Sequence, residues 1–459
     1  MTAKTIESIP FKGLDQAAVT AWSEALDDPE WFRARRLQAL LALQKLERPA
    51  GREEAWRFTN PRAAGLDRAR VIRSGGPAAP EAMDGLGAGH GKATAGGDVA
   101  EGTELDAGGL VATVDGRSGP ATLAADLAAK GVILTDLATA LREHASLVEP
   151  RFMTAAAPLD EDWFLALHAT LVSAGTFLYV PRGVRVDLPI GALYRRTQAG
   201  ATFAHTLVVV EDEAELTFVQ EHGSPEQLDG RAFHHGVTEL FVGERAAVQH
   251  LTLQEWGSEQ VVHFGVQRAL VAREGRYRSL VVTLGGGVVR IAPDARLAEG
   301  AEADFLGATF ADEGQRFEHR VTVTHAEPFT RSTLLYKGGL LGGSRNIFNG
   351  TLSISPGARG SDAAQTIRNL VLSRHAHAEA NPFLEILNSD VRAAHAAATG
   401  RVDDQHLFYL QSRGIPRDQA RRLVVFGFFE EILEQVGVPA ARRRLEAALE
   451  AELEKEVGT

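Results

Sequence analysis

The sequence predicts a mainly β protein, with a parallel β-helix core between helical N- and C-terminal parts. Between Gly175 and Gly400 it consists of short β-rich segments, which often alternate apolar and polar residues. Almost no helix-length segment intervenes there, which excludes a sheet built from βαβ units. The length of this tract, its loosely repeated strand–Gly–strand units and its shortage of hairpin turns favour a β-helix over a sandwich or barrel. Asn349-Gly350 is the one strong hairpin-type turn, and no exact repeat period is visible.

The chain of 459 residues is longer than one core usually supports, so we expect several structural parts. We expect an N-terminal helical domain over residues 1–172, a β-helix core over 173–399 and a C-terminal helical domain over 400–459. Residues 75–109 shift to Gly, Ala and small polar residues, which offer too little apolar surface to offset their ordering entropy. We therefore interpret them as a flexible insertion.

Helix signals define both flanking domains. Asp28-Pro29 predicts a helix start, with Asp28 as the capping residue and Pro29 at the first helical position, and Pro49 and Gly51 end that helix. A helical pattern returns from about Leu123 to Val172.

After Gly400, Asp403-Asp404 and Pro416 begin two further helices. The second holds the apolar run 423–429, which is too wide for one face of a solvated helix. A last helix has leucines at i, i+4 spacing: Leu445, Leu449 and Leu453.

Composition excludes several classes of function. A formal net charge of -12 argues against nucleic acid as a partner, because that binding needs basic surface. There is no signal-peptide pattern at the N-terminus and no apolar run near the roughly 20 residues of a membrane span, so we expect a cytoplasmic protein with no membrane partner. With no cysteine, the chain can supply neither a disulfide nor a thiolate.

Three polar pairs need a separate interpretation. His375 and His377 would share one face of a strand, which is more typical of a solvated face than of a metal site. His234 and His235 would point to opposite faces of an extended strand, which argues against a shared ligand. Glu385 and Asp390 could be paired acids of a polysaccharide-active β-helix enzyme, but their spacing fixes no carboxylate separation.

A set of motifs follows in order across most of the chain after residue 50. They are Arg52-Glu-Glu-Ala-Trp56-Arg-Phe-Thr59, Asp162-Trp-Phe-Leu-Ala-Leu167, Gly175-Thr-Phe-Leu-Tyr-Val-Pro-Arg-Gly183, Pro189-Ile190, His325-Ala-Glu-Pro-Phe-Thr-Arg-Ser332, Lys337-Gly-Gly-Leu340, Phe348-Asn-Gly350, Asp362-Ala-Ala-Gln365, Pro382-Phe-Leu-Glu-Ile386, Asp390-Val-Arg-Ala-Ala-His395 and Leu407-Phe-Tyr-Leu-Gln-Ser-Arg-Gly-Ile415. Together these motifs resemble the SufB/SufD family of iron–sulfur cluster assembly proteins. Each motif alone is weak, and their joint order makes chance similarity improbable.

The resemblance implies a right-handed parallel β-helix and a complex with SufB and the ATPase SufC, on which a nascent iron–sulfur cluster is built. It also implies that SufB carries the essential cysteine, so a chain without cysteine fits the other branch of the family. Where relatives often show Cys-Ser-His-Gly-Ala-Thr, this chain has Ala393-Ala-His395-Ala-Ala-Ala398, which keeps only the histidine. Asn388-Ser389-Asp390 also replaces a more usual acidic pair.

The resemblance therefore makes His395 the candidate iron ligand, facing SufB, in a cluster that this chain alone does not hold firmly. It places SufC on the C-terminal helices, where Leu423, Phe426, Phe428 and Phe429 are the candidate contact residues. We expect a scaffold subunit rather than an enzyme. The alternatives are a β-helix polysaccharide-active enzyme and a homo-oligomeric structural protein, and a homodimer is expected when SufB is absent.

Overall fold

The computed structural model describes residues 8–73, 107–437, 442–443, 446–447 and 450. Nearly all of the predicted Gly-rich insertion lies outside the described residues. So do Leu445, Leu449 and Leu453 of the predicted last helix.

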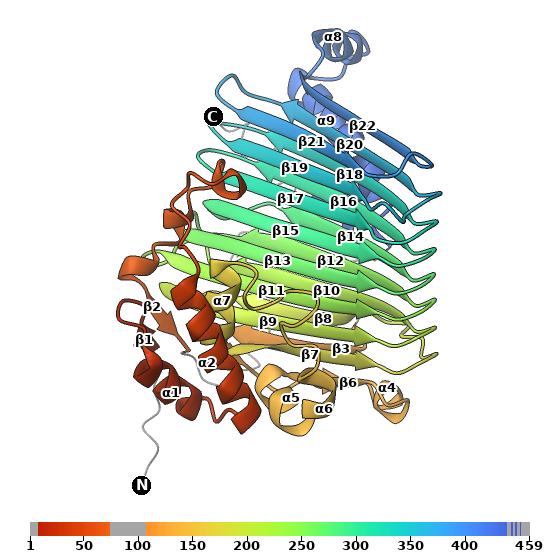
Figure 1. Ribbon diagram of the computed structural model, residues 1–459. Coiled ribbons are helices and arrows are strands. Elements are labelled where there is room, and N and C mark those ends of the chain that lie inside the picture. The colour runs from red at the N-terminus through yellow and green to blue at the C-terminus, as the bar shows by residue number, and fades with distance from the viewer. Residues whose placement is uncertain (1–7, 74–106, 438–441, 444–445, 448–449, 451–459) are drawn as a thin grey trace.

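The core is a parallel β-solenoid of about eight coils, which confirms the predicted fold class. Successive strands alternate between two sheets, so each coil gives one strand to sheet A and one to sheet B, and the coils stack along one axis (Figure 1). The solenoid strands of sheet A are β7 (Ala174–Val180), β9 (Gly200–Val210), β11 (Ala232–Val242), β13 (Val261–Val271), β15 (Val288–Leu297), β17 (Arg316–His325), β19 (Arg345–Ile354) and β21 (His377–Ile386). Those of sheet B are β3 (Gly109–Val114), β8 (Ile190–Arg195), β10 (Glu215–Ser224), β12 (Ala247–Trp256), β14 (Arg276–Thr283), β16 (Glu302–Ala311), β18 (Arg331–Leu340), β20 (Asp362–Val371) and β22 (Arg392–Arg401).

The number of residues per coil varies. In sheet B, Glu215 pairs with Ala247, 32 positions later, whereas Arg276 pairs with Glu302, only 26 positions later. The strands stay in parallel register throughout, so the turns between them absorb the difference.

Both faces of the sheets are buried along much of the solenoid. Side chains that alternate inward, such as Val208 and Phe305, fill the interior between the sheets. Outward side chains of sheet A, such as Phe203, pack beneath the N-terminal helices, and those of sheet B, such as Phe310, pack beneath a C-terminal helix. This double burial explains why many of the strand sequences are apolar at most positions.

The N-terminal part mixes helices with short strands. Its helices cover sheet A and the first coil (Figure 1). They are α1 (Gln16–Ala25), α2 (Glu30–Lys45), α4 (Ala125–Ala129), α5 (Leu137–Glu143), α6 (Ala145–Val148) and α7 (Trp163–Leu171), with single 3₁₀ turns at Glu54–Trp56, Pro61–Ala64 and Leu66–Arg68. The further strands are β1 (Ser8–Pro10), β2 (Arg70–Ile72), β4 (Arg117–Ser118), β5 (Thr122–Leu123) and β6 (Ile133–Asp136).

The prediction of helix throughout Leu123 to Val172 is wrong for β6. This strand pairs antiparallel with β7 and buries Leu134 in the solenoid interior, so tertiary pairing overrides the local helical pattern. Sheet B likewise extends into the N-terminal part, because β3 pairs with β8 in parallel register.

The start of α2 also differs from the prediction. Pro29 is the capping residue rather than the first helical one, and Asp28 caps nothing. Its carboxylate instead accepts hydrogen bonds from Ser23 Oγ at 2.7 Å and from Arg36 Nε at 2.7 Å, inside the helical layer. Arg36 is buried, so its charge requires that partner.

Both predicted C-terminal helices whose residues are described are confirmed, as α8 (Asp404–Ser412) and α9 (Arg417–Leu433). α9 packs on the outer face of sheet B, and α8 lies beyond the last coil (Figure 1). Among the described residues, no helix combines the length and the apolar character needed to cross a membrane.

Candidate partner interface at the open end of the solenoid

The two ends of the solenoid differ. At the first coil, β6 pairs with β7, and α4, α5 and α6 lie next to it (Figure 1). At the last coil, β21 and β22 end their sheets, and in the described part of the chain no strand pairs with their outer edges. The inward-facing side chains of the last coil are therefore left partly or fully exposed, although they occupy positions that are buried in the coils before it.

His395 occupies one of these inward positions. It pairs in register with Gln365 of β20, and Ala393 pairs with Ala363. Gln365 and Ala363 are both buried inside the solenoid, so the same alternation turns the His395 side chain toward the interior. His395 is exposed because, among the described residues, no further coil covers it.

The surroundings of His395 leave its imidazole accessible. The inward neighbours on its own strand, Ala393 and Ala397, are small. Behind it, Gln365 is 2% exposed, and neither of its amide atoms has a hydrogen-bond partner among the described residues. Buried amide groups usually find partners, so this end of the interior is incomplete in the isolated chain.

An imidazole nitrogen can bind iron, and it can complete a cluster whose other ligands come from a second protein. This chain supplies no thiolate, since it has no cysteine. His395 would therefore be a single ligand at a shared site.

The four candidate contact residues of α9 divide between its two faces. Phe429 is fully buried, with its ring 6.4 Å from that of Phe310 on β16, and it is part of the packing between α9 and sheet B. Phe426 and Phe428 are partly buried. Leu423 is 53% exposed, so of the four it is the residue most available to a partner.

An ion pair fixes α9 to the sheet. Lys337 of β18 is 4% exposed, and its Nζ lies 2.6 Å from a carboxylate oxygen of Glu431. The same ammonium group donates a hydrogen bond to the carbonyl oxygen of Phe428 at 2.7 Å. The helix is thus connected to the solenoid by both apolar packing and a charged contact.

Sequence reasoning missed two exposed aromatic residues on α8. Phe408 and Tyr409 are 72% and 57% exposed, whereas Leu407 beside them is buried. Adjacent aromatic residues after a helix start are a usable signal, because one helix face cannot bury three consecutive large side chains. Phe408, Tyr409 and Leu423 are the exposed large hydrophobic residues of α8 and α9.

The other polar pairs of the sequence do not form a site inside the solenoid end. His375 lies in the turn before β21, so it does not share a strand with His377, whose Nε2 contacts Glu379 at 3.0 Å on the exposed surface. Glu385 accepts a hydrogen bond from Ser353 on the outer face of sheet A. The prediction that His234 and His235 face opposite sides is confirmed, since His234 points inward and His235 contacts His168 of α7.

Comparison with protein families agrees with this architecture. A family model described as "SUF system FeS cluster assembly, SufBD core domain" matches residues 194–428, which covers about half of the chain. A second, described as "SufBD protein N-terminal region", matches residues 106–191. The core match runs from β8 to α9 and therefore includes the open end.

Individual relatives cover the chain more fully. The chain is 30% identical over 443 residues to the iron–sulfur cluster assembly protein SufD of Bacillus subtilis. The aligned region covers 95% of this chain and 97% of the relative. It is 37% identical over 316 residues to an iron–sulfur cluster assembly SufBD family protein of Mycobacterium tuberculosis, over 67% of this chain and 77% of that one. A SufBD family protein of Staphylococcus epidermidis is 28% identical over 313 residues, covering 68% and 67% of the two chains. With its two-sheet solenoid and matches of this extent, the chain belongs to the SufBD family of iron–sulfur cluster assembly proteins.

Proposed function

We propose that this chain is a non-catalytic scaffold subunit of the SUF assembly machine, which binds SufB through the open end of its solenoid and the ATPase SufC through its C-terminal helices. Membership of the family supports a role in cluster assembly. The observation that carries the proposal is the uncovered last coil, whose inward face exposes His395.

SufB suits this end because an unpaired strand edge and an exposed solenoid interior both require a cover. The backbone groups on the outer edge of β22 have no strand partner among the described residues, and such an edge can pair with a strand of another chain. A partner with a similar solenoid would continue the stack, remove His395 from solvent and bring ligands for a cluster to it. The nascent cluster is then shared between the two chains and is not held by this one alone.

SufC suits the helical end because the exposed apolar residues there are separate from those that hold α9 in place. Leu423 with Phe408 and Tyr409 offers contact area, while Phe429 and Lys337 keep α9 attached to sheet B. A displacement of α9 by the ATPase would therefore act directly on β16 and β18.

The first test is co-purification of the tagged chain with SufB and SufC, followed by anaerobic reconstitution with iron and sulfide. We expect a stable complex that holds a cluster and that loses this capacity in the His395→Ala variant. The matched control is His377→Ala, which removes another exposed histidine from the same coil. Failure to form a complex overturns the scaffold proposal, whereas a complex indifferent to His395→Ala overturns only the role of that histidine.

The second test addresses SufC. Leu423→Asp should weaken SufC binding without affecting SufB binding, because a charge replaces an exposed apolar contact and leaves the packing of α9 intact. Leu41→Asp on α2 is the control, since Leu41 is 58% exposed but far from α9 along the chain and in the fold. Equal SufC binding by wild type and Leu423→Asp would remove this residue from the interface.

A further inference from the structure

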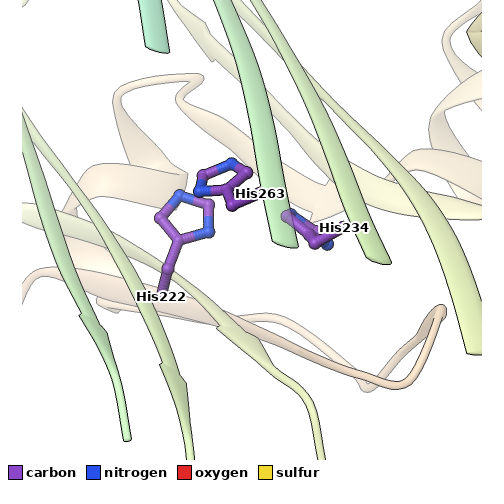
Figure 2. Close-up of side chains that lie close together, drawn as sticks. All are labelled: His222, His234 and His263. Atoms are coloured by element: carbon purple, nitrogen blue, oxygen red, sulfur yellow. The ribbon is translucent and has the colours of Figure 1, made fainter. Parts of the chain in front are cut away.

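A histidine cluster lies inside the solenoid, well before its open end. His222 of β10, His234 of β11 and His263 of β13 all point inward, and Figure 2 shows their rings converging from strands on opposite sides of the interior. The two sheets thus bring together residues that are far apart in sequence, since His222 comes from sheet B and the other two from sheet A.

The three rings leave a small space between them. One nitrogen from each ring lies within 4.8 Å of the other two, next to an internal cavity of about 10 Å³. Two glycines keep this space open. A Cβ atom at Gly236 would lie 3.4 Å from His234 Nε2, and one at Gly265 would lie 3.2 Å from His263 Nε2. The cavity is about the size needed for one water molecule or one ion.

Two of the ring nitrogens have no hydrogen-bond partner in the described part of the chain. They are Nδ1 of His222 and Nε2 of His234, both on buried residues. The other nitrogen of His234, Nδ1, lies 3.1 Å from Thr202 Oγ1, a contact that fixes the ring. Buried nitrogens without partners are costly, and two of them at one cavity point to a ligand that binds both.

We propose that His222, His234 and His263 bind one divalent transition-metal ion, with a fourth position completed by a water-derived hydroxide or another small anion. Three imidazoles with an open fourth position are a donor set typical of zinc, and imidazole also suits iron, nickel and copper. With metal–nitrogen bonds of about 2.0–2.1 Å, tetrahedral ligand atoms lie about 3.3 Å apart. The rings therefore need only small rotations to bind an ion.

The protonation state of the three histidines suits metal binding. Burial lowers the pKa of His263 to about 3 and holds the pKa of His222 and of His234 well below the usual value. All three are thus neutral at pH 7, which is the form that binds metals. The residues that line the cavity carry no carboxylate, so the anion in the fourth position offsets part of the metal charge.

Trp256 provides a built-in reporter. Its indole Nε1 donates a hydrogen bond to His263 Nδ1 at 3.2 Å, which places the proton of the neutral imidazole on Nε2. A metal bound through Nδ1 displaces the indole. A metal bound through Nε2 forces the ring proton onto Nδ1, which then faces the indole N–H. In both cases Trp256 loses its acceptor, so metal binding must change its environment.

The test uses the full-length chain. Because the cluster is enclosed, the chain is refolded in the presence of Zn²⁺ or Co²⁺, and gel filtration then removes unbound metal. We expect about one metal ion per chain by elemental analysis and the visible absorption of four-coordinate Co²⁺. His222→Phe keeps a ring in place and removes both nitrogens, so it should fold and should weaken metal binding by more than about 100-fold. His263→Gln should do the same. Zn²⁺ should alter the tryptophan fluorescence of wild type but not that of Trp256→Phe.

Two control variants make the result specific. His319→Gln alters a buried histidine outside the cluster, and His377→Gln alters a surface histidine beside a carboxylate, so both should keep the metal. A wild-type chain that takes up no metal overturns the proposal, as does a His222→Phe variant that binds as much as wild type. Loss of the metal in His377→Gln would also overturn it, by placing the ion on the surface. None of these readouts requires SufB or SufC.

Discussion

At the scale of single residues, the solenoid buries several histidines whose pKa is lowered. His250 and His319 are buried in the interior, and their hydrogen-bond partners are neutral groups, namely Tyr277 and Gln220 for His250 and Thr283 for His319. Burial lowers the pKa of both to about 3 and lowers that of His325 to about 4. An unfolded chain would protonate the same residues near pH 6.5.

These shifts predict a loss of stability in mild acid. Between about pH 6.5 and pH 4 the unfolded state binds protons that the folded state does not, so the free energy of unfolding rises with pH in this window. Above about pH 6.5 these histidines no longer reduce stability. Each pH unit below about 6.5 costs about 1.4 kcal/mol per histidine. The urea midpoint should therefore fall steadily from pH 7 to pH 5. His319→Gln should reduce the pH dependence of the free energy of unfolding by the equivalent of about one bound proton. A midpoint that is flat over this range would contradict the prediction.

At the scale of elements, α9 has a structural face and an exposed face, and their substitutions should differ. Phe429→Ala removes a fully buried ring from the contact with sheet B and should cost about 3–5 kcal/mol. Leu423→Ala alters an exposed side chain and should stay within about 0.5 kcal/mol. Limited proteolysis should show faster cleavage around α9 in Phe429→Ala alone. Equal cleavage in both variants would mean that α9 does not depend on this contact.

Elements with local signals could be predicted from the sequence, and elements that depend on long-range pairing could not. Asp403 and Pro416 correctly marked α8 and α9. β6 was missed because its pairing with β7 lies outside any local pattern. The coils could be expected but not counted, since 26 to 32 residues separate paired positions and no fixed period appears in the sequence.

The same distinction applies to the sites. His395 could be identified from a motif, but its inward orientation at an uncovered end follows only from its pairing with Gln365. The apolar run of α9 could be recognised, while the division between Phe429 and Leu423 required the position of sheet B. No sequence signal connects His222, His234 and His263, because only the stacking of coils brings them together.

At the scale of the whole molecule, the open end predicts that the isolated chain self-associates. We expect it to form a homodimer through β21 and β22 when SufB is absent, because an exposed strand edge and apolar interior favour pairing with a second copy. Ala397→Lys places a charge on the inward side of the last coil and should shift the chain to monomer in sedimentation experiments.

Ala394→Lys is the matched control, since this alanine lies on the same strand but faces outward. It should leave the self-association unchanged. A wild-type chain that is monomeric at all concentrations, or a dimer that tolerates both lysines equally, would show that the open end does not bind a second copy.

The variable length of the coils also bears on how such a protein can change over time. Since the turns already absorb differences of several residues without disturbing strand register, an insertion or deletion in a turn alters the outline of the rod and not its hydrogen-bonded frame. Evolution can thus lengthen turns into new surface loops, coil by coil, while the ends remain the same distance apart. The spacing between the N-terminal helices and the open end is set by the number of coils, which only the gain or loss of a whole coil would change.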